Sequence, residues 1–467
     1  MSSLFAVLNT SAGSLQVFQQ ALTVTQSNVA NASTPGYAKQ VQTIQPLGLD
    51  PAHGLPGGVM AGPVESARDI YAEQNVQQQV TTLGTWTQQS STLGPLQDNF
   101  DISGQTGIPA ALSSLYSSFS TWASAPNDQT ARQGVLDAAQ TVVSAFGQTG
   151  ASLTAATASA DSDLKGLVDQ VNQLTAQLRD DNIQRGSLNG PNAALEANTY
   201  ATLEQLAQLV PITSFQAKDG TTTVLLNGGM PLVMGQQQYG LQAQIGNGGD
   251  QVLDSTGRDV TTEITQGQVG GLLAARNGIL AQLTGDGTQP GQINQLAQAV
   301  ADRVNDLLES GTSSDGPPPV AGVPLFTYDA TSPGTIAQTL TVNPDLTPDQ
   351  LAANDPGPPA ASNGIPLRLA NLASPQSAAD TIGGLSYAQF FGAMAGQVGT
   401  AVSTAQNNAT EQQDVVTQAR DLRQQTSGVS LDEEAVKVLE FQRSYQAASK
   451  MVTVVDSLLQ SALDMMP

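Results

Sequence analysis

The sequence contains no cysteine and a single histidine, His53, among its 467 residues. Without cysteine the chain has no disulfides, no thiolate nucleophile and no cysteine-bound zinc or iron–sulfur cluster. One histidine excludes a metal site built from several histidines, and the Pro/Gly-rich stretch 50–58 around it predicts a solvated loop. No apolar run reaches the roughly 18 residues that a membrane-spanning helix needs, so we expect no membrane insertion.

Charged residues and aromatics are also scarce, at 12% and 4% of the chain. The 16 Lys and Arg are outnumbered by 39 Asp and Glu, which gives a formal net charge of −23. An acidic chain without a basic cluster does not favour binding to nucleic acid or anionic lipid. With 39% hydrophobic residues the chain is too apolar for disorder. Its few large side chains favour long helices that pack along narrow apolar seams.

The first 38 residues carry no charge, and Lys39 is the first charged side chain. A cleaved secretory signal begins with a basic segment, which this chain lacks. We therefore expect either a cytosolic protein or one exported by a route that reads an uncleaved N-terminus.

Both ends of the chain carry a seven-residue apolar repeat with the 3,4 spacing of a coiled coil. We expect Ser33-Thr-Pro-Gly36 to end the first helix, and Ser430 and Glu433 to form a capping box that starts the last. On pattern alone, core stripes of an ordinary bundle and assembly seams fit equally well, and the uncharged surface of residues 1–38 favours packing on partners. The N-terminal seam is Leu4, Leu8, Leu15, Phe18, Leu22 and Val29; the C-terminal seam is Leu431, Val438, Phe441, Tyr445, Val452, Val455 and Leu459.

The middle of the chain is mostly helical in pattern. Helices are predicted over 66–93, 106–124, 128–184, 192–209, 268–283 and 293–310, and a long repeat runs over 391–422. The period changes at 221–234, where Asn227-Gly228 predicts a β-hairpin turn, and a small extended element is expected around 338–342.

The predicted fold is therefore mainly α: an elongated multi-helix bundle whose coiled-coil N- and C-terminal helices pair together, with a small β-rich insert. The predicted domains are a terminal coiled-coil core (1–62 and 417–467), a helical bundle (63–210 and 266–416), the β-rich insert (211–265, hairpin at 221–234) and a loop-rich, reduced outer region (312–380).

Motifs that carry chemistry are weak throughout. Ser162 and Lys165 have a nucleophile–base spacing but lie in a predicted helix without companion motifs. The glycine-containing segments 246–249 and 285–287 lack the context of a phosphate loop and are interpreted as turns. Four aspartates without a calcium loop are expected on solvated helix faces: Asp161, Asp163, Asp180 and Asp181. The sequence thus predicts no enzyme, no catalytic or metal site and no cofactor.

Two motifs at opposite ends of the chain carry a family resemblance. Residues 28–40, Asn-Val-Ala-Asn-Ala-Ser-Thr-Pro-Gly-Tyr-Ala-Lys-Gln, resemble the N-terminal signature of bacterial flagellar rod, hook and hook-associated proteins, and 427–434 with 441–447 are similar to the matching C-terminus. Pro35-Gly36 ends the helix, and Tyr37 is expected to anchor the turn against a neighbour. The signature turn comprises Asn28, Asn31, Thr34, Pro35, Gly36 and Tyr37.

The middle of the chain is similar to the hook-associated protein 1 family, the hook–filament junction proteins. Arg68-Asp-Ile-Tyr71, Leu115-Tyr-Ser-Ser-Phe119 and Gly267-Gln-Val-Gly-Gly-Leu-Leu273 carry this similarity. Two departures stand out. Residues 195–198 read Leu-Glu-Ala-Asn where the family often has a charged run, and 329–372 is too short for the larger outer β-domain of many relatives.

The resemblance implies a structural component of the flagellum that joins hook to filament after type III export, with an extracellular location and no cleaved signal peptide. It implies that the terminal helices pair antiparallel. The implied partners are other copies in a helical ring, the hook protein, a second junction protein on the filament side, the filament cap protein during assembly, and an export chaperone on the C-terminal helix. A rod or hook axial subunit remains one alternative, and a secreted helical effector or enzyme is another.

Overall fold

The computed structural model describes residues 2–50, 55–101, 105–187, 192–217, 219–246, 248–286, 288–314, 318–357 and 359–464. His53, residues 315–317 and the last repeat position, Met466, lie outside these residues. The chain is mainly helical, which confirms the predicted fold class. None of the described helices combines the length and apolarity needed to cross a membrane.

The chain divides into two compact units, each made of separate stretches of sequence. Unit 1 comprises Met1–Thr81, Gln173–Tyr239 and Gln412–Pro467, and unit 2 comprises Thr82–Asn172 and Gly240–Glu411. The domains expected from the sequence have other boundaries, since the expected β-rich insert (211–265) includes residues of both units. That finer assignment stays a prediction.

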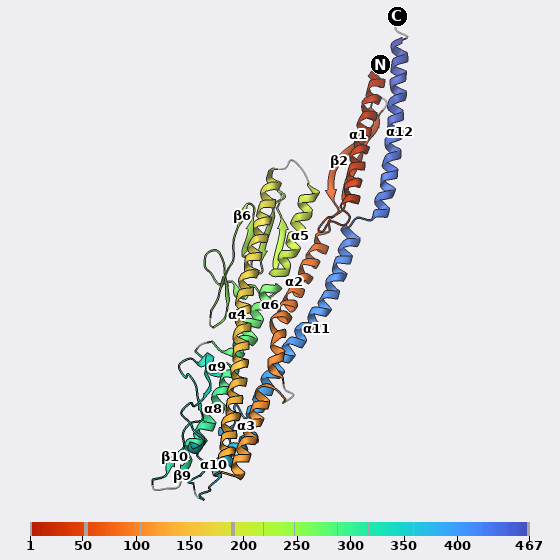
Figure 1. Ribbon diagram of the computed structural model, residues 1–467. Helices are drawn as coiled ribbons and strands as arrows, with labels where there is room; N and C mark the ends of the chain where they lie inside the picture. Colours follow the sequence, from red (N-terminus) through yellow and green to blue (C-terminus); the bar gives the residue numbers. More distant parts are fainter. Residues whose placement is uncertain are drawn as a thin grey trace. The chain divides into compact units, whose positions relative to one another are not determined.

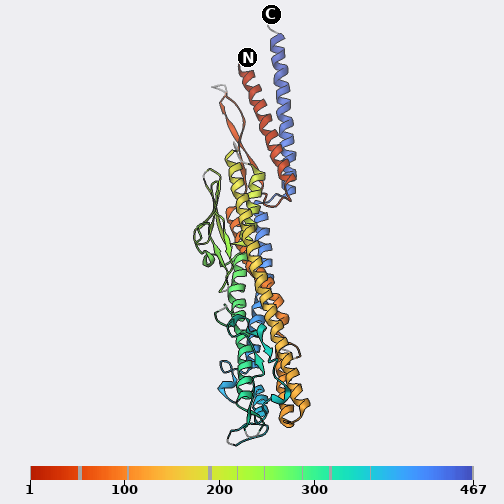
Figure 2. The ribbon, with the colours of Figure 1, turned by 60° about the vertical axis from the view of Figure 1, so that its left-hand side comes forward.

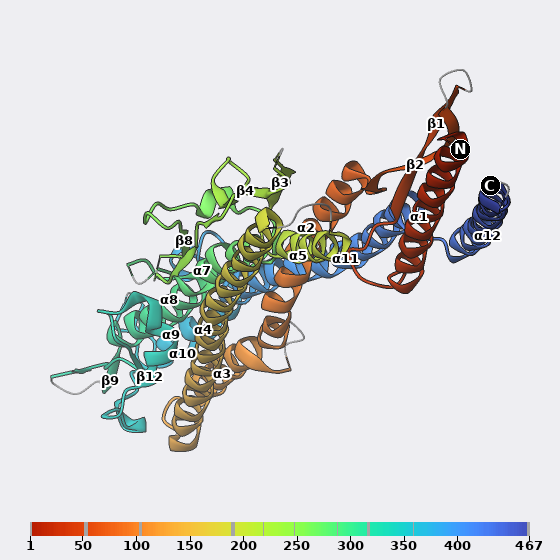
Figure 3. The same ribbon diagram turned by 90° about the horizontal axis from the view of Figure 1, so that it is seen from above.

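Unit 1 contains both terminal helices. Helix α1 (Ser2–Ala30) and helix α12 (Leu431–Asp464) lie side by side and run in opposite directions (Figure 1). A β-hairpin, β1 (Gln40–Asp50) and β2 (Leu55–Ser66), pairs antiparallel and packs along α1 (Figure 3). A second view shows the pair and the hairpin as one slender group (Figure 2). The two terminal helices and the hairpin thus form one packed structure.

A second part of unit 1 surrounds a small sheet. The strands are β3 (Ile212–Gln216), β4 (Thr222–Leu226), β5 (Pro231–Met234) and β6 (Gln237–Gln238), in that spatial order and all antiparallel. The predicted hairpin is present as β4 and β5, with Gly228 and Gly229 at positive φ in the turn. The side chain of Asn182 fixes β4, because it exchanges hydrogen bonds of 2.7 and 2.8 Å with the backbone of Thr222.

Three long helices contribute to both units. They are α2 (Ile70–Leu93), α4 (Gln129–Ser187) and α11 (Tyr387–Ser427). Helix α5 (Ala193–Leu209) belongs to unit 1 alone, and its N-cap is Asn192, whose side chain accepts from the Leu195 N–H. These helices match the predicted segments closely, since their apolar repeats are long and regular.

Unit 2 has the larger apolar core. Its other helices are α3 (Gly107–Ser124), α6 (Gly267–Ala274), a π-helical turn (Ala275–Leu280), α7 (Ala281–Thr284), α8 (Gln292–Glu309), α9 (Ile336–Thr339) and α10 (Gly364–Ala370). Phe100 and Phe391 stack with ring centroids 5.7 Å apart. The largest buried side chains in this core are Phe119, Trp122, Phe146, Phe326, Tyr387 and Phe391.

The remaining elements of unit 2 are short. They are the strands β7 (Gln242–Gln244), β8 (Gln251–Leu253), β9 (Thr312–Ser314), β10 (Val320–Ala321), β11 (Phe326–Thr327) and β12 (Thr341–Val342), and 3₁₀ turns at Gly94–Phe100, Thr261–Glu263, Pro333–Thr335, Pro348–Gln350, Asn371–Ala373 and Ala378–Asp380.

Two local expectations differ from the structure. The extended element around 338–342 is a strand only at Thr341–Val342, because Gln338 and Thr339 complete α9. The hairpin β1–β2 has no counterpart among the predicted elements. Its strands contain four glycines and three prolines, which hide the alternation by which strands are usually found.

Candidate functional site

The site lies where the two terminal helices meet the signature turn, within unit 1. Along the α1–α12 contact, Leu4, Leu8, Leu15, Phe18 and Leu22 are half-buried and Val29 is exposed. On α12, Val455 and Leu459 are buried, Val438, Phe441 and Val452 are half-buried, and Leu431 and Tyr445 are exposed. The role of these residues as assembly seams stays a prediction.

The most buried line of α1 is offset by about one residue from the predicted seam. Val17, Ala21, Thr25 and Asn28 are all nearly inaccessible. The offset has a physical cause: β1 and β2 pack on α1 in addition to α12, so α1 buries a second face. Sequence reasoning that considered only a helix pair did not include this third element.

Asn28 is the centre of a polar cluster at the C-terminal end of α1. Its side chain is 1% exposed and makes four hydrogen bonds. The Oδ1 atom accepts from the Tyr37 hydroxyl and the Gln40 N–H, both at 2.9 Å, while Nδ2 donates to the Gln40 carbonyl at 2.8 Å and to Glu434 Oε2 at 2.9 Å. A fully bonded amide in this position fixes the turn and α12 together.

Glu434 is the acidic residue of α12 that joins this cluster. It is wholly buried, and its Oε1 accepts from Lys437 Nζ at 3.1 Å and lies 3.7 Å from Lys39 Nζ. Lys39 also donates to the exposed Glu433 at 2.7 Å. This hydrogen bond raises the pKa of Lys39 and lowers the pKa of Glu433. Asn28, Tyr37, Lys39, Glu433 and Glu434 are called the terminal cluster below.

The start of α12 shows one half of the predicted capping box, while the Glu433 carboxylate accepts from Lys39. The Glu433 N–H donates to Ser430 Oγ at 3.4 Å, and the Glu434 N–H donates to the Ser430 carbonyl at 3.0 Å. Three acidic residues, Asp432 to Glu434, occupy the first turn, where the helix dipole favours negative charge.

The signature turn rests on α5. Gly36 has φ +72°, and a Cβ on it would lie 2.3 Å from the Ala197 carbonyl oxygen, so a side chain here is excluded both by strain and by contact. Inside the turn, Thr34 Oγ1 donates to Asn31 Oδ1 at 3.2 Å, and Asn31 donates to the Ser27 carbonyl at 2.9 Å. The tyrosine hydroxyl anchors the turn to Asn28 of the same chain, and burial raises the pKa of Tyr37.

A buried charge network holds this turn from the other side. Arg68 donates to the Gly36 carbonyl at 2.6 Å and to Glu196 at 2.7 Å, also pairs with Glu73, and lies 3.9 Å from the centroid of the Tyr200 ring. Glu196 belongs to the run in which the sequence departs from the family pattern. In the sequence Arg68 stands out only as part of a motif, because its partners Gly36 and Glu196 are 32 and 128 positions away.

The network continues into α11. Arg423 pairs with Glu73 at 3.1 Å and with Glu204 at 2.7 Å, and Arg420 pairs with Glu204. Burial alone would raise the pKa of Glu204, but the hydrogen bonds from the two arginines lower it. At the end of α11, the Ser427 carbonyl accepts from the Lys39 N–H at 2.9 Å and its hydroxyl accepts from the Asp69 N–H at 2.8 Å. The turn, α2, α5 and α11 are therefore tied together.

One face of α12 carries large apolar side chains that are each more than half exposed. At 3.6 residues per turn, Val436 and Val454 are about five turns apart and point the same way. The members of this exposed line are Val436, Leu439, Met451, Val454 and Leu458.

Shallow grooves flank α1. One of about 430 Å³ lies between α1, the hairpin and α12, and is lined by Ser11, Ser14, Gly58 and Ala447 among others. A second, of about 480 Å³, lies between α1 and the hairpin and includes Gly13. Their walls mix small residues with larger side chains, such as Phe18 and Met451 in the first groove and Leu47 and Met60 in the second.

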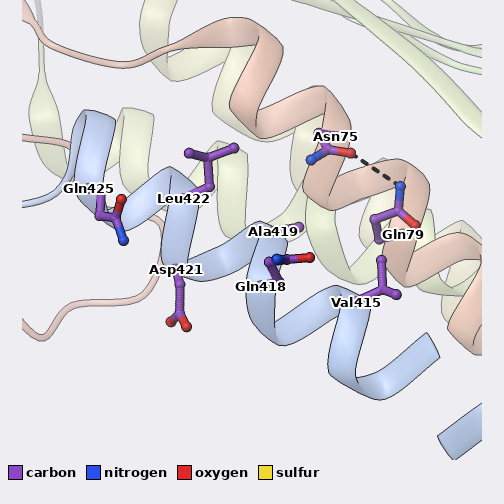
Figure 4. Close-up of a pocket in the computed structure, with 8 residues that line it drawn as sticks. All are labelled: Asn75, Gln79, Val415, Gln418, Ala419, Asp421, Leu422 and Gln425. Carbon is purple, nitrogen blue, oxygen red and sulfur yellow. Dashed lines mark hydrogen bonds between the residues drawn. The ribbon is translucent and has the colours of Figure 1, made fainter. Parts of the chain in front are cut away.

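A third groove, of about 440 Å³, lies between the first turns of α2 and the end of α11 (Figure 4). Asn75 and Gln79 line one wall and are joined by a 3.1 Å hydrogen bond, while Val415 and Leu422 stand exposed on the other. Asp421 is the one carboxylate among the residues that line this groove, and the others are amides and aliphatic groups.

The described residues contain no group of three or more His, Cys, Asp or Glu arranged to hold a metal ion. Two of the four aspartates expected on solvated faces are not solvent-exposed. Asp181 is buried and accepts from Asn198 and Thr199, and Asp161 accepts from Arg276 at 2.6 Å. Their partners lie on other elements, so helical pattern alone did not show the burial.

Taken together, antiparallel terminal helices joined by a signature turn, with a helical middle and an exposed apolar face, define an axial structural subunit. Three family models match the chain: the flagellar hook-associated protein FlgK helical domain at residues 93–326, the flagellar basal body rod protein at 8–37, and the flagellar basal body rod FlgEFG protein C-terminal region at 415–465. The chain belongs to the flagellar hook-associated protein FlgK family.

Individual relatives agree. The chain is 25% identical to flagellar hook-associated protein 1 of Bacillus subtilis over 507 aligned residues, with 99% of both chains covered. It is 21% identical to flagellar hook-associated protein 1 of Escherichia coli, covering 99% of this chain and 100% of the relative. The structure of the flagellar hook junction protein FlgK from Burkholderia pseudomallei matches with a TM-score of 0.65 at 15% identity, over 75% of this chain and 99% of that one, which shows a shared fold.

The family membership gives the chain a structural role at the hook–filament junction of the bacterial flagellum. It is a flagellar component that assembles with other flagellar proteins, and it is not an enzyme.

Proposed function

We propose that the chain joins hook to filament by polymerising through α1, α12 and the β1–β2 hairpin, as a ring of copies between the hook protein and a second junction protein on the filament side. The observation that carries this proposal is the exposed line of α12. Five large apolar side chains stand exposed on one face of one helix, two near its start and three near its end, and exposed apolar groups of this kind mark a protein–protein contact.

The same unit offers a second, hollow surface. The groove between α1 and the hairpin includes Gly13 among larger side chains and shares no residue with the line on α12, which consists of large side chains. Two different surfaces that fit each other make a heterologous contact, which propagates from copy to copy in a ring or helix. Residues 1–38 carry no charge, so the approach of a second copy meets no like-charge repulsion from α1.

The terminal cluster would serve this assembly by setting the register of the helix pair. Apolar contacts between helices tolerate a shift of one turn, but the four hydrogen bonds of Asn28 do not. Each copy would then present its grooves and its exposed line at fixed positions relative to each other.

We further propose that the protein reaches the outside of the cell through the flagellar type III route, without a cleaved signal peptide. An apolar face of this size favours aggregation before assembly. An export chaperone that covers the C-terminal helix would prevent this, and the filament cap protein would act next to the finished ring.

Electron microscopy of cells lacking the gene tests the role, and variants of the exposed line test the mechanism. Finished hooks without filaments, with flagellin released into the medium, are expected from the deletion. Complementation with the double variant Leu439→Glu/Val454→Glu should leave that defect, while Gln442→Glu/Gln460→Glu, which adds the same charge to exposed positions of α12 outside the line, should restore filaments.

Two results would contradict the proposal. Missing hooks in the deletion strain would instead indicate a rod or hook subunit. Normal filaments with Leu439→Glu/Val454→Glu would exclude the exposed line as the contact, provided that circular dichroism shows the purified variant to be as helical as the control.

A further inference from the structure

The β7–β8 hairpin of unit 2 is held by side chains from the π-helical turn at Ala275–Leu280. Asn277 accepts a 2.7 Å hydrogen bond from the Asp250 N–H and donates a 2.9 Å bond to the Asp250 carbonyl. Gly249 lies next to this contact at φ +130°, and a Cβ there would lie 3.0 Å from Asn277 Oδ1. The backbone at Asp250 is thus fixed by one amide, as a strand neighbour would fix it.

The carboxylate of Asp250, in contrast, makes few hydrogen bonds. The residue is 1% exposed, and Oδ2 is buried without a hydrogen-bond partner among the described residues. Oδ1 has only a 3.4 Å contact with the Gly246 N–H and lies 3.7 Å from Arg276 Nη2. A buried carboxylate in this state has lost its hydration without full compensation.

The guanidinium of Arg276 is directed mainly to another carboxylate. Its Nε donates to Asp161 Oδ1 on α4 at 2.6 Å, and its Nη2 donates to the Gly246 carbonyl at 3.3 Å. One arginine therefore serves two aspartates, and the group of three carries an excess negative charge in a buried place when both acids are ionised. Two carboxylates in one site favour the retention of one proton.

We propose that Asp250 and Asp161 share a proton under mildly acidic conditions, and that this proton fastens the β7–β8 hairpin to α4. The protonated Asp250 carboxyl becomes a donor, and the Asp161 carboxylate is the acceptor. The ionisable groups that act on Asp250 are Asp161 from α4 and Arg276 from the π-helical turn, while its own loop contributes the Gly246 N–H.

The direction of the pH effect follows from linkage. Burial, with a further contribution from Asp161, raises the pKa of Asp250 from 3.8 to about 6, although Arg276 opposes this. An acid whose pKa is higher in the folded state binds its proton more tightly there. The attachment of the hairpin is therefore weakest above pH 6 and strengthens as the pH falls through about 6 towards 3.8.

Hydrogen exchange on the full chain measures this attachment directly. Protection factors, which correct for the intrinsic pH dependence of exchange, are compared for the amides of residues 242–253 at pH 7.5 and pH 5.0. From the two pKa values, protection is expected to rise about tenfold on acidification. Amides of the β4–β5 hairpin in unit 1 are the internal reference and should change little.

Matched variants separate the shared proton from a general effect of acid. Asp250→Asn supplies a permanent donor, so its protection at pH 7.5 should already be high and should not change at pH 5.0. Asp161→Asn frees Arg276 for Asp250 and should move the response to lower pH. Asp163→Asn, on the exposed face of α4, should behave as the wild type.

Equal protection of the wild type at the two pH values would overturn the proposal, as would an undiminished pH response in Asp250→Asn. If Asp250→Asn does not fold, the protection factors of the wild type and of Asp161→Asn at the two pH values still test the proposal. The outcome is independent of the junction role, because it concerns one hairpin in an isolated chain.

Discussion

The core of unit 2 and the terminal helices of unit 1 are both built on an apolar helical repeat, but they use it differently. In unit 2 the apolar residues of the repeat pack around large side chains, such as Phe119, Trp122 and Phe146, that are fully buried within one chain. In the α1–α12 pair most of the predicted seam is only half-buried, and a second apolar face of α12 stands open to solvent.

The difference indicates where each part obtains its stability. Buried aromatic and aliphatic area stabilises unit 2 without help from another molecule. The terminal pair buries less apolar surface per residue, and its geometry is fixed by the terminal cluster of hydrogen bonds and charges. A helix pair of this kind has a defined register but an incomplete core, which a second copy is proposed to complete.

The largest effect is expected from a cavity in the core of unit 2. Phe119→Ala removes a fully buried ring and should lower the free energy of unfolding by about 3–5 kcal/mol. Phe18→Ala, in the half-buried seam of α1, should cost about 1–2 kcal/mol in the isolated chain. Urea unfolding followed by tryptophan fluorescence and by far-ultraviolet circular dichroism measures the two losses, and equal values would contradict the comparison.

A smaller, local effect is expected at the terminal cluster. Asn28→Ala leaves Glu434 and the Tyr37 hydroxyl without their amide partner in a buried place, at a cost of about 2–3 kcal/mol. The loss should be confined to unit 1, so hydrogen exchange should accelerate at 37–42 and at the start of α12 and not in α3.

Asn31→Ala provides the control, because Asn31 binds only within its own turn and is less buried. If Asn28→Ala changed exchange no more than Asn31→Ala, the cluster would not be what holds the terminal pair in register.

Much of this architecture is predictable because it depends on local pattern. The long helices follow from repeats that extend over several turns, and the β4–β5 turn follows from Asn227-Gly228. The end of α1 follows from the proline and glycine at 35 and 36. In each case the physical cause lies within a few residues of its effect.

The rest depends on contacts between distant residues, which a single sequence does not reveal. Asn28 and Glu434 are 406 positions apart, and Arg68 and Glu196 are 128 apart. The sequence places Asn28 in a signature and Glu434 beside a helix cap, but it does not pair them. The β1–β2 hairpin was missed for a related reason, since its glycine-rich strands are stabilised by packing on α1 and not by their own alternation.

The smallest effect on stability is expected from the Lys39–Glu433 pair of the terminal cluster. The pKa shifts of the two groups determine how this effect depends on pH. The Lys39–Glu433 hydrogen bond lowers the pKa of Glu433 and raises the pKa of Lys39. The contribution of Glu433 is therefore complete above its usual pKa of 4.5 and is lost as the pH falls through the lowered value. That of Lys39 is complete below 10.5 and is lost as the pH rises through the raised value.

Glu433→Gln should lower the pKa of Lys39 but change the melting temperature at pH 7 very little, because an exposed ion pair is strongly screened by solvent. A titration of the Lys39 side chain by NMR measures the first effect and calorimetry the second, with Glu440→Gln as a control for the change in net charge. A fall in melting temperature as large as that of Asn28→Ala would mean that the exposed pair and the buried amide act as one cooperative network. The contrast between the two parts of the molecule would then depend on charge as much as on burial.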